Sequence, residues 1–392
     1  MRIPAIIFGL AVVAAATPAF AQSSVNALAS AEKVIAEVKE KCAPDKRQAV
    51  FEVKPYMDTD GRLVVGGKVS EAAHKAALVE ALDQSATDYA DSVIVLPDTL
   101  WGQVRIAVAC LRTRPGHASE MATQAIMGTP LRLLEKEGEW WRVQSPDGYI
   151  SYIVDNSIRE KSTAEMARWR SANRFIVTDP YQIRAYRNSR DTGVRDVVTD
   201  LVNGCIVEQA NETPVLENGK LLVRLPDGRT GYVDAKALAP VEEWAAQSFD
   251  PQKILDLAYS MEGTPYLWGG MSPKSLDCSG LVKVCYFANG LILRRDASQQ
   301  ALTGQRIEAQ DWRRCHAGDL LFFGNAKTGR VTHVAIYDHD GHYVHSSGMV
   351  KRNSVDPEDP SYLTTPFLHA VRIQGSEETP GITRARNHPW YF

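Results

Sequence analysis

Residues 276–282 read LDCSGLV, and structural and chemical signals coincide in this stretch. Asp277 is a residue type that favours the N-cap of a helix. The apolar residues that follow share one helical face: Leu281, Val282, Cys285 and Tyr286. Asn289 and Gly290 end this pattern. Cys278 is therefore predicted in the first helical turn, where free backbone N–H groups and the positive end of the helix dipole favour a thiolate.

A second stretch, residues 331–345, predicts a β-hairpin that carries two histidines. In VTHVAIY, polar and apolar residues alternate as they do in a strand, DHDG predicts a turn, and HYVH predicts the second, antiparallel strand. A turn centred on His339 would place His333 directly opposite His345, with β-carbons about 5 Å apart on one sheet face. One imidazole could then act as a base that the other orients. A shift of one residue would send His345 to the opposite face.

Metal binding and disulfide formation are other roles open to these residue types. Two imidazoles and the Cys278 thiolate could ligate zinc, but a cysteine on a helix N-terminus favours nucleophilic work, so no metal site is predicted. A disulfide between Cys278 and Cys285 is excluded, because seven helical residues span about 10 Å. A Cys42–Cys110 bridge stays open. Surface positions are expected for the remaining histidines of this region: His316, His339, His342 and His369.

At these residues the chain resembles the NlpC-type cell-wall peptidases, a papain-like family. Four blocks occur in the family's order between residues 250 and 373: DCSGL, GDLLFF, THVAIY and a second histidine. The resemblance implies Cys278 as nucleophile, His333 as general base and acid, and His345 as the group that orients His333. It also implies hydrolysis of an amide in peptidoglycan stem peptides, commonly between γ-D-glutamate and L-lysine or diaminopimelate, without a cofactor.

Two stretches of short strands precede this region. Each has a Pro-Asp-Gly turn, at 146–148 and 226–228, ahead of a strand that contains tyrosine, which looks like an internal duplication. The pattern resembles bacterial SH3-like β-barrels. The fold class is therefore α+β. Its expected parts are a helical and small α+β region at 22–107, barrels at 108–160 and 172–242, a papain-like peptidase domain at 248–375, and a tail at 376–392 that is an extended wrap or disordered.

The layout resembles a subgroup in which the first barrel recognises the free amino end of a short muropeptide. A buried ammonium needs a carboxylate and an aromatic wall. Glu120 is the candidate carboxylate, and Tyr152 or Tyr149 the candidate aromatic. Ser151-Tyr152 departs from the Gly-Trp that such barrels often carry. Further substrate-binding residues implied by the resemblance are two groove-wall aromatics and three polar contacts: Tyr266, Trp268, Asp277, Ser279 and Ser298.

The first 21 residues predict a secretory leader. Arg2 precedes a short apolar run, and small residues lead to a cleavage site near Ala21. We expect an exported protein, periplasmic or extracellular, with no later segment long enough to span a membrane. The net charge of −3 gives no basic excess for nucleic acid. Muropeptides are the expected partners, and the protein is expected to be a monomer.

Two other functions are compatible with the sequence. The first is a papain-like acyltransferase or amidase, of which the acyltransferase would resolve the acyl-enzyme with an amine in place of water. A non-catalytic cell-wall-binding protein would retain the fold without the reaction. The presence of Cys278, His333 and His345 together argues against the second alternative, because degenerate enzymes usually lose at least one catalytic residue.

Overall fold

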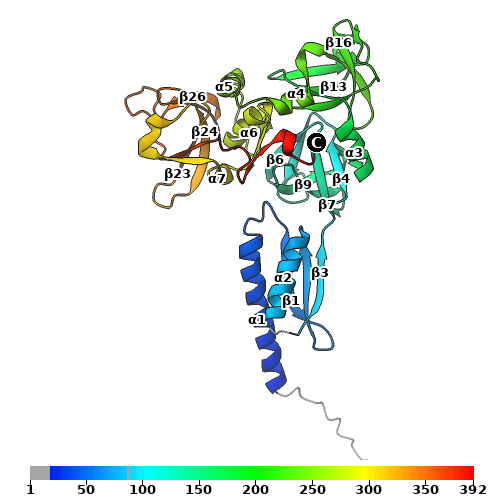
Figure 1. Cartoon of the computed structure of the whole chain (residues 1–392), viewed down its shortest axis with the longest axis vertical. Coiled ribbons are helices and arrows are strands. Elements are labelled where there is room, and N and C mark those ends of the chain that lie inside the picture. The colour runs from blue at the N-terminus through cyan, green and yellow to red at the C-terminus, as the bar shows by residue number, and fades with distance from the viewer. Residues whose placement is uncertain (1–17, 86–87) are drawn as a thin grey trace, which may run out of the picture. The chain divides into compact units, whose positions relative to one another are not determined.

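The computed structural model describes residues 18–85 and 88–392, and the chain forms two compact units that divide between Leu96 and Pro97 (Figure 1). Most of the predicted leader, residues 1–17, lies outside the described residues.

The N-terminal unit is a small α+β fold, as predicted. Strand β1 is antiparallel to β2, whereas β3 is parallel to β2 and is reached through helix α2, as a βαβ crossover requires. Apolar residues of both helices pack with those of the sheet, including Ile35, Val65 and Leu78 (Figure 1). The elements are α1 Pro18–Cys42, β1 Phe51–Met57, β2 Leu63–Val69, α2 Ala72–Gln84 and β3 Ala90–Val95.

The first barrel is a sheet in the order β10-β4-β7-β8-β9-β5-β6. It begins earlier than the predicted residue 108, because β4 pairs with both β10 and β7. Strand β4 is hard to recognise from sequence because it contains Gly102, a residue type that is rare inside strands. Glycine is needed there, because a Cβ would lie 3.0 Å from the side chains of both Ile158 and Leu133. The strands are β4 Trp101–Val104, β5 Val108–Arg112, β6 Met121–Ile126, β7 Pro130–Glu137, β8 Trp140–Gln144, β9 Ile150–Val154 and β10 Ile158–Lys161.

Helix α3, Thr163–Ser171, begins with a capping box of Ser162 and Glu165 and leads to the second barrel. The two barrels share a core in which Met127 of the first packs with residues of the second. Helix α4, Val241–Ala246, follows. The strands are β11 Arg174–Val177, β12 Gln182–Tyr186, β13 Val197–Val202, β14 Ile206–Gln209, β15 Leu216–Glu217, β16 Lys220–Arg224, β17 Thr230–Asp234 and β18 Leu238–Pro240.

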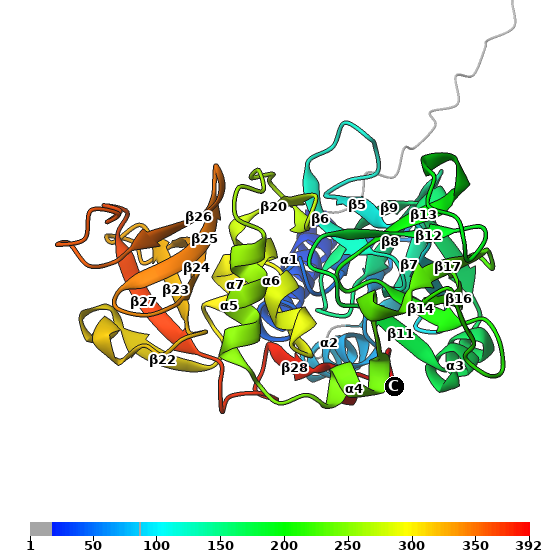
Figure 2. The same ribbon diagram turned by 90° about the horizontal axis from the view of Figure 1, so that it is seen from above.

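The peptidase domain has a sheet in the order β22-β27-β23-β24-β25-β26, and helices α5 and α6 lie between this sheet and the barrels (Figure 2). Asp250 caps α5, as predicted. The helices are α5 Pro251–Ser260, α6 Cys278–Ala288 and α7 Ala297–Gln300. The strands are β19 Met271–Ser272, β20 Ser275–Leu276, β21 Leu291–Leu293, β22 Gln305–Glu308, β23 Leu320–Gly324, β24 Val331–Tyr337, β25 His342–Ser347, β26 Met349–Ser354, β27 Phe367–Arg372 and β28 Ile382–Arg384.

The segment after residue 375 is an ordered wrap. Strand β28 pairs with β21, and Tyr391 is 2% exposed in a cluster with Trp169 and Trp244. Of the two forms predicted for this tail, the extended wrap is correct.

Short 3-10 helices complete the fold; they are Asp155–Ser157, Val194–Asp196, Ala235–Ala237, Ala309–Arg314 and Ala385–Asn387. Among the described residues, no helix combines the length and the apolar character needed to cross a membrane.

Candidate active site

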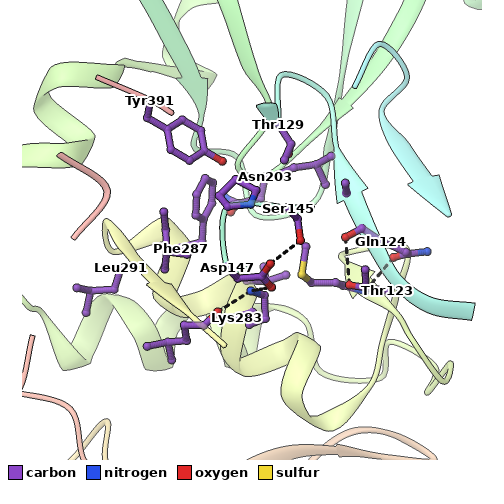
Figure 3. A pocket seen from close by; sticks show the side chains of 17 residues that line it. Thr123, Gln124, Thr129, Ser145, Asp147, Asn203, Lys283, Phe287, Leu291 and Tyr391 are labelled. Carbon is purple, nitrogen blue, oxygen red and sulfur yellow. Dashed lines mark hydrogen bonds and ion pairs between the residues drawn. The ribbon is translucent and has the colours of Figure 1, made fainter. Parts of the chain in front are cut away.

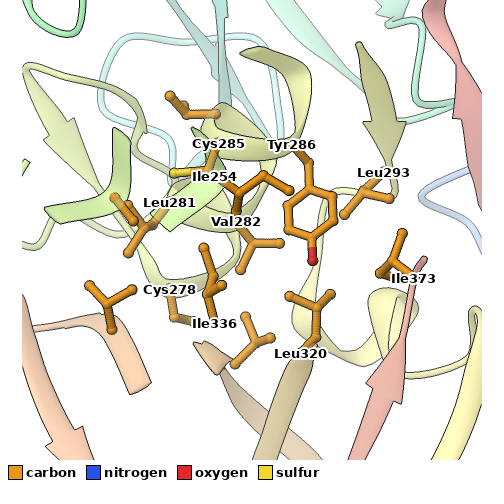
Figure 4. Close-up of a cluster of buried hydrophobic side chains, with 14 of the residues drawn as sticks. Ile254, Cys278, Leu281, Val282, Cys285, Tyr286, Leu293, Leu320, Ile336 and Ile373 are labelled. Carbon is orange, nitrogen blue, oxygen red and sulfur yellow. The ribbon is translucent and has the colours of Figure 1, made fainter. Parts of the chain in front are cut away.

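Helix α6 begins and ends as its sequence predicts. The Asp277 carboxylate accepts a hydrogen bond from the Gly280 N–H at 2.7 Å, and Asn289 is the C-cap. Glycine is required at position 280, because a Cβ there would clash with the Gly270 carbonyl. The helix is buried on the sheet through a cluster that includes Leu281 and Ile336 (Figure 4). These contacts fix the N-terminus of α6, and with it Cys278.

Cys278 is 7% exposed. Burial, followed by the Asp277 carboxylate, raises the pKa of its thiol to about 11. The backbone N–H groups of Val334 and Ser279 act in the opposite direction. The thiol therefore lies against Val334, the residue after His333. Burial thus opposes the expected preference for a thiolate, because desolvation acts against the favourable field of the helix N-terminus.

The two histidines lie side by side, but in a different register from the predicted one. Ile336 pairs with Val344 and Tyr337 with Tyr343, so the turn is centred on Asp340 instead of His339 and the strand pairing is shifted by two residues. A displacement of two residues keeps every side chain on the same face. His333 and His345 are consequently diagonal neighbours, with Nε2 of His333 2.7 Å from Nδ1 of His345.

Asn353 on β26 joins Cys278, His333 and His345 as a fourth side chain of the site and extends the hydrogen-bonded series that runs from His333 to His345. Its Oδ1 lies 2.9 Å from Nε2 of His345, and its Nδ2 donates to the Ser361 carbonyl at 2.8 Å. An amide oxygen can only accept, so Nε2 of His345 carries hydrogen and its Nδ1 accepts. Nε2 of His333 must then be the donor to that Nδ1. The lone pair of His333 is left on Nδ1.

Both imidazoles are neutral at physiological pH. Burial, and then the neighbouring His345, lower the pKa of His333 to about 3. Burial lowers the pKa of His345 to about 4, although its hydrogen bond to Asn353 opposes this. The site thus pairs a neutral thiol with a neutral base.

Asp277 and Ser279 are engaged by a buried arginine that the sequence analysis missed. Arg295 donates to Asp277 Oδ2 at 2.5 Å and to Ser279 Oγ at 2.8 Å. The Gly269 N–H also donates to Asp277 at 2.9 Å. In this state the Asp277 carboxylate therefore stabilises the N-terminus of α6.

Glu120 and Trp268 come together from two domains. Nε1 of Trp268 donates to Oε1 of Glu120 at 2.8 Å, although 148 positions separate them in the sequence. Trp268 is 61% exposed, so the pair forms an open wall. Tyr266 pairs with Leu276, two residues before Cys278. Burial, followed by the Cys278 and Asp277 charges, raises the pKa of its phenol.

The other predicted residues lie at varying depth. The guanidinium carbon of Arg142 lies over the Tyr152 ring, 5.8 Å from the centre of that ring. Tyr149 is buried and interacts electrostatically with Arg295. Ser298 is partly buried on α7, which packs against β24.

Of the histidines expected at the surface, His316 and His339 are exposed and His342 is partly buried. His369 is buried, and its ring stacks on Phe322. The expected surface position of His369 is wrong, because β27 is an inner strand of the sheet.

Asn353 and Arg295 differ in how far the sequence could have revealed them. Gly348 lies between two strand-like stretches and predicts a further hairpin, so an amide near His345 was within reach of the pattern. Arg295 gave no signal, because its hydrogen-bond partners come from two segments distant from it in the sequence, at Thr123 and at 277–279.

Each of the six cysteines, Cys42 and Cys110 included, is a free thiol. Within residues 18–85 and 88–392, no group of three or more His, Cys, Asp or Glu side chains is arranged to hold a metal.

The fold and the site define a cysteine peptidase with attached SH3-like barrels. Residues 263–372 match the NlpC/P60 family, and residues 111–158 match the bacterial dipeptidyl-peptidase SH3 domain. The chain is 38% identical over 121 residues to the probable endopeptidase NlpC of Escherichia coli, covering 30% of this chain and 75% of that protein. The chain belongs to the NlpC/P60 family.

Longer alignments connect it with dipeptidyl-peptidases. It is 28% identical over 266 residues to dipeptidyl-peptidase 6 of Lysinibacillus sphaericus, covering 65% of this chain and 92% of that protein. It is 24% identical to the gamma-D-glutamyl-L-lysine dipeptidyl-peptidase of Bacillus cereus, covering 63% and 74%. The fold is shared with the crystal structure of an NlpC/P60 family protein from Bacillus cereus, at TM-score 0.59 and 19% identity, covering 70% of this chain and 99% of that one.

Proposed function

We propose that this enzyme hydrolyses the amide bond between γ-D-glutamate and an L-diamino acid, lysine or diaminopimelate, in peptidoglycan stem peptides. The observation that carries the proposal is the hydrogen-bonded series from His333 through His345 to Asn353, beside the Cys278 thiol. The name of the Bacillus cereus relative, a gamma-D-glutamyl-L-lysine dipeptidyl-peptidase, supports this bond. Export through the leader predicted at residues 1–21 would bring the enzyme to this substrate.

In the proposed mechanism, Nδ1 of His333 takes the proton from the Cys278 sulfur as the sulfur attacks the amide carbon. Backbone N–H groups in the first turn of α6 stabilise the oxyanion. The imidazolium then gives its proton to the leaving amine, which leaves an acyl-enzyme. Water activated by His333 hydrolyses the thioester and restores the thiol. His345 acts through His333 by keeping its ring oriented.

Substrate selection is assigned to the first barrel and the groove. The exposed Glu120 carboxylate, held by Trp268, binds the free ammonium of an N-terminal L-alanine, and an aromatic side chain completes the wall. Tyr152 or Tyr149 is the proposed aromatic. Tyr266 lines the groove beside the thiol. Ser279 and Ser298 are the proposed polar contacts to the γ-D-glutamyl group, whereas Asp277 acts by supporting α6.

The test compares the variants C278A and C285A on the peptide L-Ala-γ-D-Glu-L-Lys, with release of lysine followed by mass spectrometry. Cys285 lies on the same helix and is fully buried in the core, which makes it a matched control. We expect C278A to lose activity by at least about 10³-fold and C285A to keep most of it. Full activity of C278A would refute the proposal.

The role of Glu120 is tested with the same peptide carrying either a free or an acetylated N-terminus. E120Q removes the charge and keeps an oxygen for Trp268, so KM for the free peptide should rise about tenfold while the acetylated peptide is unaffected. E160Q is the control, because Glu160 also accepts from a tryptophan of the first barrel, Trp141, at 3.2 Å. Equal effects of the two variants would contradict the assignment.

A further inference from the structure

The two Pro-Asp-Gly turns of the barrels have the same geometry. Gly148 and Gly228 have φ of 83° and 89°, a left-handed conformation that favours glycine. Oδ1 of Asp147 accepts from the N–H two residues later at 3.2 Å, and Oδ1 of Asp227 does the same at 3.2 Å. One carboxylate oxygen therefore closes each turn, and the other is available for a second partner.

In each turn that second oxygen binds a cation from a different domain. Oδ2 of Asp147 lies 2.6 Å from Nζ of Lys283 on helix α6, and Oδ2 of Asp227 lies 3.1 Å from Nε of Arg105 in the first barrel. The repeated motif thus connects the first barrel to the peptidase domain and the second barrel to the first. The motif found in the sequence is a domain contact as well as a turn.

The contact to α6 is a buried ion pair. The side chains of Lys283 and Asp147 are 9% and 7% exposed, and Lys283 also donates to the Leu293 carbonyl at 2.6 Å. Burial alone would raise the pKa of Asp147, but the Lys283 ammonium holds it below its usual value, so the carboxylate stays charged. The pair lies in the wall of a cavity of about 70 Å³ that barrel and peptidase residues line together. Figure 3 shows the Asp147 and Lys283 side chains directed toward each other.

The peptidase side of the chain holds the rest of this turn as well. Nη1 of Arg294 donates to the Asp147 carbonyl at 3.0 Å, and Nε2 of His388 lies 2.8 Å from the Pro146 carbonyl. By contrast, a Cβ at Gly228 in the second turn would meet open space. The first turn is enclosed on several sides, whereas the second is not.

The same barrel also contacts the supports of the catalytic helix through β6. Oγ1 of Thr123 accepts from Nε of Arg295 at 2.7 Å, and Oε1 of Gln124 accepts from the Met271 N–H at 2.9 Å. Strand β6 begins directly after Glu120. A displacement of the barrel would therefore move Glu120 relative to Cys278.

We propose that Asp147 and Lys283 are positioning residues that hold the first barrel at a fixed place on helix α6 and thereby set the selectivity of the groove for a free amino end. This proposal rests on the proposed function, in which Glu120 binds the free ammonium of the substrate. The pair acts through Glu120, and neither residue touches the reacting atoms.

The test uses the double variant D147N/K283M, which removes both charges and approximately preserves volume, so that no unpaired charge stays buried. The control is D227N/R105M, the corresponding pair at the second turn, where Oδ2 of Asp227 also accepts from Arg229 of its own barrel at 2.9 Å. We expect the preference for the free over the acetylated peptide to fall at least tenfold in D147N/K283M, through KM. The preference in D227N/R105M, and the rate of Cys278 alkylation by iodoacetamide in both variants, should stay within about twofold of wild type.

Hydrogen exchange supplies a readout that needs no substrate. The Met271 N–H donates to Gln124 of the barrel. Its hydrogen-exchange rate should rise in D147N/K283M and stay at the wild-type value in D227N/R105M. Unchanged exchange and unchanged peptide preference in D147N/K283M would overturn the positioning role. If the wild type cleaves neither peptide, the proposed function fails, while the exchange experiment still decides whether the pair fixes the barrel. If the double variant does not fold, D147N alone serves, because Lys283 then keeps an amide oxygen at position 147 and the Leu293 carbonyl as acceptors.

Discussion

Asn353 is at the end of the series of side chains that begins at His333, and its amide oxygen accepts from His345. Because that oxygen can only accept, it determines the tautomer of both imidazoles and leaves the basic lone pair on Nδ1 of His333. N353A should therefore lower kcat about 10–100-fold with little change in KM. N353D keeps the acceptor and should retain most activity. Steady-state kinetics on the free peptide decides, and equal losses in both variants would contradict this role.

The two histidines also make the stability depend on pH. The pKa of His345 is about 4 in the folded protein, against 6.5 for an unperturbed histidine. Between these values the unfolded chain binds a proton that the folded chain does not, so the free energy of unfolding falls as pH falls. The loss from His345 reaches at most about 3 kcal/mol. Melting temperatures from pH 7 to pH 4 should fall less steeply for H345Q than for wild type, and parallel curves would contradict this account.

At the scale of elements, the N-terminus of α6 depends on Asp277 more than an ordinary helix depends on its cap. Asp277 caps the helix and also neutralises the buried Arg295. D277A should cost about 3–5 kcal/mol, because it leaves a buried cation without its partner. D250A, at the N-cap of α5, should cost about 1 kcal/mol. Urea unfolding of both variants measures the difference, and similar costs would show that Arg295 finds another acceptor.

These elements also show what sequence can predict. The bounds of α6 follow from local signals, because caps and apolar spacing act within a few residues. The common face of His333 and His345 follows from alternation, but the register was wrong by two residues, because a turn centre is less constrained than a face. Arg295 could not be predicted, because Asp277 and Ser279 meet it only through the tertiary fold and Thr123 only where the barrel contacts the peptidase domain.

At the scale of the whole molecule, the segment after the peptidase domain connects the parts of the unit that comprises residues 97–392. Tyr391 packs with Trp169 of the connecting helix, Trp244 of α4 and Phe287 of α6. Its carbonyl accepts from the buried Arg174 of the second barrel at 2.8 Å. One side chain thus contributes to the junction of the barrels and the catalytic helix.

Replacement of Tyr391 by alanine should therefore affect cooperativity as well as stability. Y391A should cost about 3–5 kcal/mol, as large aromatic truncations in cores do. Because the lost contacts join domains, we expect the barrels and the peptidase domain of Y391A to unfold in separate calorimetric transitions, and residues 97–392 of the wild type to unfold in one. Y181A, at a tyrosine 49% exposed on the second barrel, is the control and should change neither. A single, merely shifted transition in Y391A would mean that the ion pairs between the domains suffice to couple them.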